Sequence, residues 1–151
     1  MKRIAIIAAV IAIFFIIGIS SLGPYVPEHE ICKGTAACFS GIVTQVTDGD
    51  TIKVDGKPIR LALSSSPELH ESGGIGAREF TLEFCPIGSV AIVDEDDGQR
   101  EGSFGRMIAA VYCGDNLLNS ALLDFRKGVI DERFCRSSEF SGEDWVKRHG
   151  C

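Results

Sequence analysis

Two short runs of this sequence carry side chains of the types that bind cations and phosphate groups. In Asp48-Gly49-Asp50-Thr51, two carboxylates flank a glycine, and a second run extends from Arg60 to Glu68. Carboxylate oxygens are preferred ligands of hard cations, and a guanidinium group bonds two phosphate oxygens at once. Asp-Gly turns are common by themselves. The pattern becomes distinctive because Gly98-Gln99-Arg100 and Phe104-Gly105-Arg106 follow later in the chain.

The segments around the first run have the composition of β-strands. Residues 42–46, 51–54 and 59–63 are rich in β-branched and large apolar side chains. Asp55-Gly56 stands between the second and third segments and favours a hairpin with positive φ. We therefore expect three strands in meander order, with Asp48 and Asp50 in the turn that joins the first two.

The rest of the chain alternates between helical and strand patterns. Apolar spacing predicts helices over residues 77–85 and 118–125, and a capping-box pattern at residues 141–144 predicts a third short helix. Residues 89–93 and 106–112 are β-prone, and the acidic run at residues 94–97 between them is expected to be a solvated loop. This order predicts a β-rich α+β fold, a five-stranded OB-fold barrel with about three short helices.

With these runs, the chain resembles the thermonuclease, or staphylococcal-nuclease-like, family over residues 40–106 and more loosely to the C-terminus. The spacing from Arg60 to Glu68, and from Phe80 to Arg106, fits the family pattern without gaps. The resemblance implies an OB fold and calcium-dependent hydrolysis of DNA or RNA phosphodiesters, with single-stranded DNA or RNA as substrate.

The resemblance also implies roles for five residues. Asp50 matches a metal-binding carboxylate, and Ser66 stands where the family uses a threonine whose backbone carbonyl binds the metal. Arg60 and Arg106 match the arginines that hold the scissile phosphate. Glu68 matches the carboxylate that orients or deprotonates the attacking water. The implied cofactor is Ca²⁺.

Position 65 departs from the family pattern. The family has a second metal-binding aspartate there, and this chain has Ser65. Because calcium affinity depends partly on the charge of the ligands, we expect weakly held calcium and slow catalysis. Asp48 and His70 are the nearest groups that could compensate, although imidazole is a poor calcium ligand. The alternative is a catalytically impaired OB module that binds nucleic acid or a protein partner at the membrane. No base-stacking residue is assigned, and Phe104 stands where the family commonly has tyrosine.

The N-terminus has the pattern of a membrane segment. Lys2 and Arg3 precede an uncharged apolar run over residues 4–22, which is close to the length that spans a bilayer. We expect residues 1–26 to form a membrane anchor, with an uncleaved or cleaved signal segment as the alternative and a buried core helix as a weaker one. The basic residues predict that the rest of the chain lies outside the cytoplasm, anchored or secreted after cleavage.

All six cysteines follow the apolar segment, as expected for disulfides in an exported domain. Residues 27–39 are interpreted as a linker, closed by a local bond between Cys32 and Cys38, and residues 40–151 as the OB domain. The ends of the predicted elements suggest Cys85 with Cys113 and Cys135 with Cys151. A structural zinc site is the weaker interpretation, because the histidines lack a finger-like spacing.

The net charge restricts how this domain could bind nucleic acid. The chain has 21 acidic and 15 basic residues, and two of the basic ones precede the apolar segment. Because non-specific nucleic-acid grooves are usually basic, any contact must come from a few well-placed arginines. We expect the domain to be monomeric. A purely structural role is a third possibility, and no residue pattern argues for it.

Overall fold

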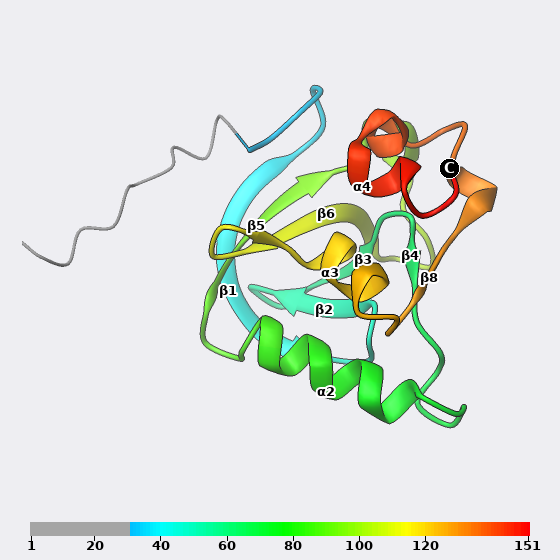
Figure 1. Ribbon diagram of the computed structural model, residues 1–151. Coiled ribbons are helices and arrows are strands. Elements are labelled where there is room, and N and C mark those ends of the chain that lie inside the picture. The colour runs from blue at the N-terminus through cyan, green and yellow to red at the C-terminus, as the bar shows by residue number, and fades with distance from the viewer. Residues whose placement is uncertain (1–30) are drawn as a thin grey trace, which may run out of the picture.

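The computed structural model describes residues 31–151 (Figure 1). The predicted membrane segment at residues 4–22 lies outside the described residues, as do the whole predicted anchor region at residues 1–26 and the start of the linker. Within residues 31–151, no helix is both long enough and apolar enough to cross a bilayer.

Five strands form a closed barrel. Antiparallel pairing joins β1 (Cys38–Val46) to β2 (Thr51–Val54) and to β5 (Val90–Glu95), β2 to β3 (Lys57–Leu61), and β5 to β6 (Met107–Cys113). Parallel pairing between β3 and β6 closes the barrel. The predicted five-stranded barrel is confirmed, and its closure fits an OB-like fold.

The β2–β3 hairpin is built as its sequence predicts. Asp55 and Gly56 have φ values of 48° and 76°, the left-handed conformation that this tight turn requires. The third strand differs from the prediction, because it ends at Leu61 and Leu63 adopts a φ of 59°. This bend leads into the short strand β4 (Ser64–Ser65), which pairs with β8 (Val129–Ile130).

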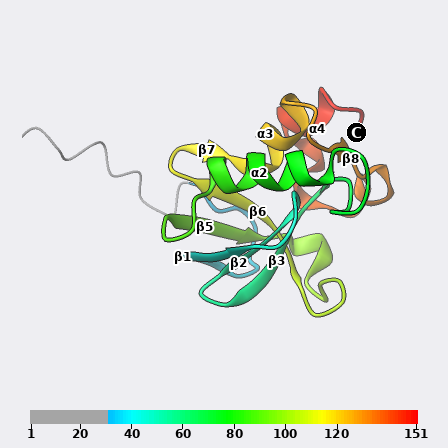
Figure 2. The same ribbon diagram turned by 90° about the horizontal axis from the view of Figure 1, so that it is seen from below.

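Residues 31–151 contain three short α-helices, as predicted: α2 (Gly74–Phe84), α3 (Leu118–Asp124) and α4 (Asp144–Lys147). Figures 1 and 2 show α2 lying across one side of the barrel with α3 next to it. The predicted capping box is wrong, because the residue that caps α4 makes no side-chain cap hydrogen bond. The other elements of the described part of the chain are β7 (Asn116–Leu117) and the 3-10 turns η2 (Asp97–Gln99), η3 (Glu132–Phe134) and η4 (Glu139–Gly142).

The barrel interior is apolar, and one buried amide fastens α3 to it. The largest fully buried side chains include Ile52, Ile59, Leu61, Leu118 and Leu122. Asn119 is fully buried and bridges three backbone groups: it accepts from Val111 N at 2.9 Å and donates to the carbonyl oxygens of Ala62 and Ala109 at 2.9 and 3.1 Å. Because a buried polar group is costly unless it is hydrogen-bonded, this network fixes where α3 sits.

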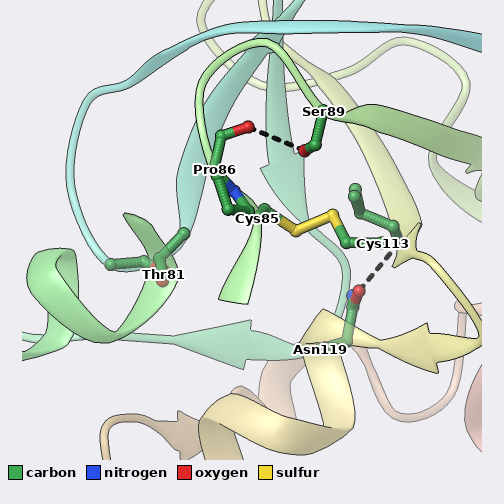
Figure 3. Close-up of a disulfide and its surroundings, with 8 residues drawn as sticks. Thr81, Cys85, Pro86, Ser89, Cys113 and Asn119 are labelled. Atoms are coloured by element: carbon green, nitrogen blue, oxygen red, sulfur yellow. Dashed lines mark hydrogen bonds between the residues drawn. A yellow bond between two sulfur atoms is a disulfide. The ribbon is translucent and has the colours of Figure 1, made fainter. Parts of the chain in front are cut away.

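All six cysteines are paired as the sequence suggested: Cys32 with Cys38, Cys85 with Cys113, and Cys135 with Cys151. Figure 3 shows the Cys85–Cys113 disulfide, which joins the residue after α2 to the end of β6. Both of its cysteines are buried. This disulfide is therefore part of the barrel core.

The acidic run at residues 94–97 is not a solvated loop, and that prediction is wrong. Asp94 and Asp96 are fully buried. Asp96 accepts hydrogen bonds from the backbone of Gly98 and Glu139, both at 3.0 Å. Backbone donors that lack partners in helices or strands bind these carboxylates, so the run anchors neighbouring loops.

Candidate functional site

The turn between β1 and β2 places Asp50 at the barrel wall. Asp48 Oδ1 accepts a hydrogen bond from the backbone N–H of Asp50 at 3.1 Å, which closes the turn locally. Gly49 stands between these two aspartates, and a Cβ atom added to it would lie 2.6 Å from both Ser66 Oγ and Ala77 Cβ. Glycine is therefore required here, because the turn packs directly against Ser66 and α2.

The carboxylate of Asp50 is buried, and both of its oxygens are hydrogen-bonded. Asp50 is only 3% exposed to solvent. Oδ1 accepts from Arg60 Nη1 at 2.8 Å and from Thr51 Oγ1 at 3.1 Å, and Oδ2 accepts from Ser66 N at 2.7 Å. Burial raises the pKa of Asp50, while the charge of Arg60 and the Ser66 N–H act in the opposite direction.

Arg60 connects Asp50 to position 65, where this chain has serine in place of the aspartate of the thermonuclease pattern. The β2–β3 register places Arg60 opposite Thr51, beside Asp50. One guanidinium nitrogen bonds Asp50, and the other, Nη2, donates to Ser65 Oγ at 3.1 Å. A hydroxyl thus occupies the place where a carboxylate would give the guanidinium a second anionic partner. The charges of Asp50 and Arg60 balance each other.

Arg60 and Arg106 line the same cavity, which has a volume of about 410 Å³. The parallel β3–β6 pair brings them together, because Arg60 pairs in register with Ile108, two residues beyond Arg106. Other residues that line this cavity, here called the arginine cavity, are Leu61, Leu63, Gln99, Gly102, Ser103, Phe104, Ile108, Asp131, Arg133 and Phe134. The structure therefore joins two of the predicted site residues, although they are far apart in sequence.

An exposed aromatic ring belongs to the same cavity. Phe104 is 97% exposed and has a φ of 52°, followed by Gly105 with a φ of 74°. Positive φ is uncommon for a bulky residue and costs energy, so the fold holds Phe104 outward at some expense. Arg106 closes this turn, with Nε donating to the carbonyl oxygen of Ser103 at 3.2 Å.

Arg133 was missed from the sequence, and it adds a third guanidinium group to the arginine cavity. It forms two hydrogen bonds with Asp131, at 2.8 and 2.7 Å, and lies 5.4 Å from the ring of Phe134. The hydrogen bonds from Arg133 hold the pKa of Asp131 below its usual range, and the charge of Arg60 adds to this effect. The adjacent arginine and phenylalanine in Asp131-Glu132-Arg133-Phe134 could have marked this segment as a candidate part of the site. It lies beyond residues 40–106, where the resemblance to the family pattern is only loose.

Glu68, the predicted base, is not joined to the other site residues. It is exposed, and its backbone N–H donates to Glu71 Oε2 at 2.8 Å. It does not line the arginine cavity. His70 is exposed as well. Ser65 and Ser66 instead line a second, more open hollow of about 320 Å³ together with Glu71, Arg126 and Lys127.

The predicted metal ligands fit calcium in kind but not in charge. Asp50 supplies carboxylate oxygens and Ser66 a backbone carbonyl, and oxygen is the ligand that calcium prefers. Asp50 is already neutralised by Arg60, and Ser65 adds no charge. Calcium would therefore have to compete with a guanidinium group for the only carboxylate of the predicted pair.

The arrangement as a whole is a cationic cavity in an acidic protein. Three guanidinium groups and one carboxylate line it, whereas the chain has a net charge of −6. Planar guanidinium groups at a concave surface can bind phosphate oxygens. Comparison with models of known protein families finds no match to this chain.

Proposed function

We propose that this chain is a phosphodiesterase that hydrolyses single-stranded DNA or RNA with weakly held calcium, in the manner of thermonucleases. The proposal depends mainly on one observation. Arg60 contacts the buried carboxylate of Asp50 and also lines the cavity that Arg106 shares. A phosphate-binding group and a candidate metal-binding group are therefore in direct contact.

Arg60 and Arg106 are proposed to hold the scissile phosphate. A phosphate oxygen in the arginine cavity would compete with Asp50 and Ser65 for the guanidinium hydrogen bonds of Arg60. Binding of substrate would thus release the Asp50 carboxylate from its counter-ion. Asp50 and the Ser66 carbonyl would then hold calcium, which supplies a Lewis acid for the phosphoryl group when bound.

Glu68 is proposed as the group that orients or deprotonates the attacking water. It lies in an exposed loop directly after Pro67, and Ser66 joins this loop to Asp50 through the backbone N–H. A carboxylate so close in sequence to the metal-binding carbonyl can reach the same phosphate if the loop moves toward the cavity. Slow catalysis follows from this requirement as well as from the missing carboxylate at Ser65.

A single-stranded substrate suits the surface better than a duplex. The exposed ring of Phe104 offers a face on which a base can stack. The cationic groups are confined to one cavity, and the acidic remainder would repel a long duplex backbone. We propose that a monomeric domain acts outside the cytoplasm, anchored through residues 4–22 or released by cleavage, because three disulfides persist in an oxidising compartment.

The test is cleavage of labelled single-stranded DNA and RNA by the full-length protein, with calcium and with EDTA. Slow, calcium-dependent cleavage that disappears in Arg106→Gln is the expected result. Arg78→Gln is the matched control, since Arg78 Nε binds the Val46 carbonyl and does not line the arginine cavity. Cleavage that persists in EDTA would refute the role of the metal.

A Ser65→Asp variant tests whether the missing carboxylate limits the reaction. It should bind calcium about tenfold or more tightly, because a second anionic ligand offsets Arg60. Ser65→Asn is the control of similar size without the charge. If both variants bind calcium equally, the charge at position 65 is not what limits the metal site.

A second function, binding without hydrolysis, is favoured by two observations. Both oxygens of Asp50 are engaged by protein donors, and Glu68 lies outside the arginine cavity. Such a module would bind oligonucleotides equally well in calcium and in EDTA, and Arg60→Gln and Arg106→Gln would each weaken binding. Absence of cleavage in wild type and in Ser65→Asp, with binding retained, would select this function.

A further inference from the structure

A disulfide and a buried carboxyl group meet at the other end of β1. Cys38 of β1 pairs directly with Asp94 of β5, and Cys32 is bonded to Cys38. The two sulfur atoms and a carboxylate oxygen of Asp94 all lie within 4.8 Å of one another. None of these residues belongs to the arginine cavity.

The carboxyl group of Asp94 is incompletely hydrogen-bonded. The residue is fully buried, and Oδ2 accepts from the backbone N–H of Lys33 at 3.0 Å. Oδ1 has no partner, and among residues 31–151 it is the only buried side-chain nitrogen or oxygen of which this is true. Burial raises the pKa of Asp94, which favours the protonated form. A protonated carboxyl group has a hydrogen that it can donate to a neighbouring atom.

We propose that Cys32–Cys38 is a redox-active disulfide that exchanges with dithiols, and that Asp94 gives a proton to, and takes it from, the sulfur that leaves and returns. The chemical class of substrate is a dithiol, small or on a protein, which the reaction oxidises to a disulfide.

The reaction is balanced in electrons and protons. A thiolate of the dithiol attacks one sulfur of the Cys32–Cys38 bond and forms a mixed disulfide. The electron pair of the broken bond goes to the other cysteine sulfur, which takes the proton of Asp94. The second thiol of the substrate then gives its proton to the Asp94 carboxylate and attacks the substrate sulfur of the mixed disulfide. The remaining cysteine leaves as a thiolate and takes from water the proton that the first thiol of the substrate had released. The protein gains two electrons and two protons, and the dithiol loses them.

The other two disulfides are less suited to this chemistry. Cys85 is fully buried and Cys113 is 8% exposed, whereas Cys32 and Cys38 are both partly exposed. Cys135 is partly exposed and Cys151 is exposed, so that pair differs from Cys32–Cys38 in loop length and not in access. Cys32 and Cys38 are also separated by only six positions, compared with 28 and 16 for the other pairs. A short loop removes the least entropy from the unfolded chain, so breaking this bond costs the fold least.

The loop between Cys32 and Cys38 is held by hydrogen bonds that do not need the disulfide. The backbone N–H groups of Thr35 and Ala36 both donate to the Asp97 carboxylate. The backbone N–H of Ala37 donates to Glu95 Oε2 at 3.0 Å, and its carbonyl accepts from Glu95 N at 2.9 Å. The reduced form therefore keeps the two thiols near Asp94, where a second disulfide can oxidise them by the reverse exchange.

Several charged or titratable groups surround Asp94 and will shape the pH dependence. The charges of Asp96 and Asp97 disfavour the ionisation of Asp94, and the charge of Lys33 favours it. The charge of Asp94 in turn contributes to the raised pKa values of Glu139 and Tyr112. The test therefore compares variants over a range of pH.

The experiment follows reduction of each disulfide in the full-length protein by dithiothreitol, with acid quenching, alkylation and mass spectrometry. Cys32–Cys38 should be reduced about tenfold or more faster than Cys135–Cys151. Asp94→Asn should slow this reduction about tenfold at the acidic end of the pH range, where Asp94 holds its proton. After correction for thiolate concentration, the wild-type rate should fall as pH rises through the titration of Asp94, whereas the variant should show no such fall.

Glu95→Gln is the matched control, because it also changes a carboxylate that contacts this loop. It should keep the wild-type pH profile. A merely structural role for Asp94 would change the rate without changing that profile, and would overturn the proposal. Equal reduction rates for Cys32–Cys38 and Cys135–Cys151 would also overturn it. So would tight zinc binding by the reduced protein without dithiol exchange, which would assign the two thiols and Asp94 to a metal site instead.

Discussion

Two buried aspartates lie near the two ends of β1, and they differ in their hydrogen bonds and in their charged partners. Asp50 has both carboxylate oxygens hydrogen-bonded, and Arg60 neutralises its charge at 2.8 Å. Asp94 is as deeply buried, but one oxygen has no partner and no guanidinium or ammonium group forms an ion pair with it among the described residues. Burial raises the pKa of both.

The difference is one of charge compensation. Ionised Asp50 is stabilised by its partner, so removing the partner leaves a buried charge without compensation. Asp94 has no such partner to lose, and its ionisation is itself unfavourable. The first arrangement is suited to exchanging one ion for another, as phosphate or calcium binding requires. The second is suited to holding a proton. Removing the cationic partner of Asp50 and removing the charge of Asp94 should therefore change stability in opposite directions.

The largest effect is expected for Arg60→Leu. The free energy of unfolding at pH 7 should fall by about 3 to 5 kcal/mol, because the buried carboxylate of Asp50 loses its counter-ion. Urea denaturation measures the change. Adding Asp50→Asn to the variant should restore a large part of the loss, since no charge is then left buried. A loss that is unaffected by the second substitution would show that packing, and not charge, makes Arg60 important.

Asp94→Asn should raise the free energy of unfolding at neutral pH, whereas Arg60→Leu should lower it. A raised folded-state pKa means that the wild type loses stability as pH rises from the unfolded-state value near about 4 through the folded-state value. The asparagine variant does not titrate, so its relative stability should increase over this range, to about 1 to 3 kcal/mol at pH 7. Denaturation at pH 4 and pH 7 measures the difference. A variant less stable than wild type at pH 7 would contradict this account.

Arg133→Gln should affect binding more than stability. The side chain is largely exposed but lines the arginine cavity, so its loss should weaken oligonucleotide binding in EDTA about twofold to fivefold at low salt. Arg136→Gln is the control, because Arg136 is an exposed arginine nearby that does not line the cavity. Fluorescence anisotropy with a labelled oligonucleotide compares them. Equal weakening in both variants would mean that general charge, and not the cavity, binds the strand.

The smallest effect is expected at an exposed aspartate. Hydrogen bonds from Arg148, and further ones from His149 and Ser120, lower the pKa of Asp124. A lowered folded-state pKa contributes stability that is present at neutral pH and lost as pH falls below the unfolded value of about 4. Because the group is exposed and screened, Asp124→Asn should cost only about 0.5 kcal/mol at pH 7. The difference from wild type should disappear in strong acid, and a cost that persists there would point to packing.

Local patterns explain why much of the fold was predictable. β-Branched segments and the Asp55-Gly56 turn specify strands and a hairpin through nearest neighbours, and helical spacing of apolar residues marks α2 and α3. The disulfides were predictable for a similar reason. Once the elements were placed, Cys85 and Cys113 lay at element ends that an OB barrel brings together, and Cys135 and Cys151 flanked the predicted last helix. The last helix was predicted correctly from a capping box that does not form.

The candidate site was predictable in part. The runs from Asp48 to Thr51 and from Arg60 to Glu68 marked Asp50, Arg60 and Ser66, and the structure brings these into one hydrogen-bonded group. Their assignment to calcium and catalysis stays a prediction. Glu68 was placed with them by spacing alone, but its loop carries it into solvent.

Residue types and spacing were sufficient to specify the strands, the helices and the cysteine pairs, because each depends on short-range conformational preference or on the order of elements. Closure of the barrel decided the rest. The β3–β6 pairing joins Arg60 to Arg106, and the β1–β5 register sets Cys38 beside Asp94. Which charge is neutralised, and which is left alone, depends on distances across the barrel that no local pattern encodes.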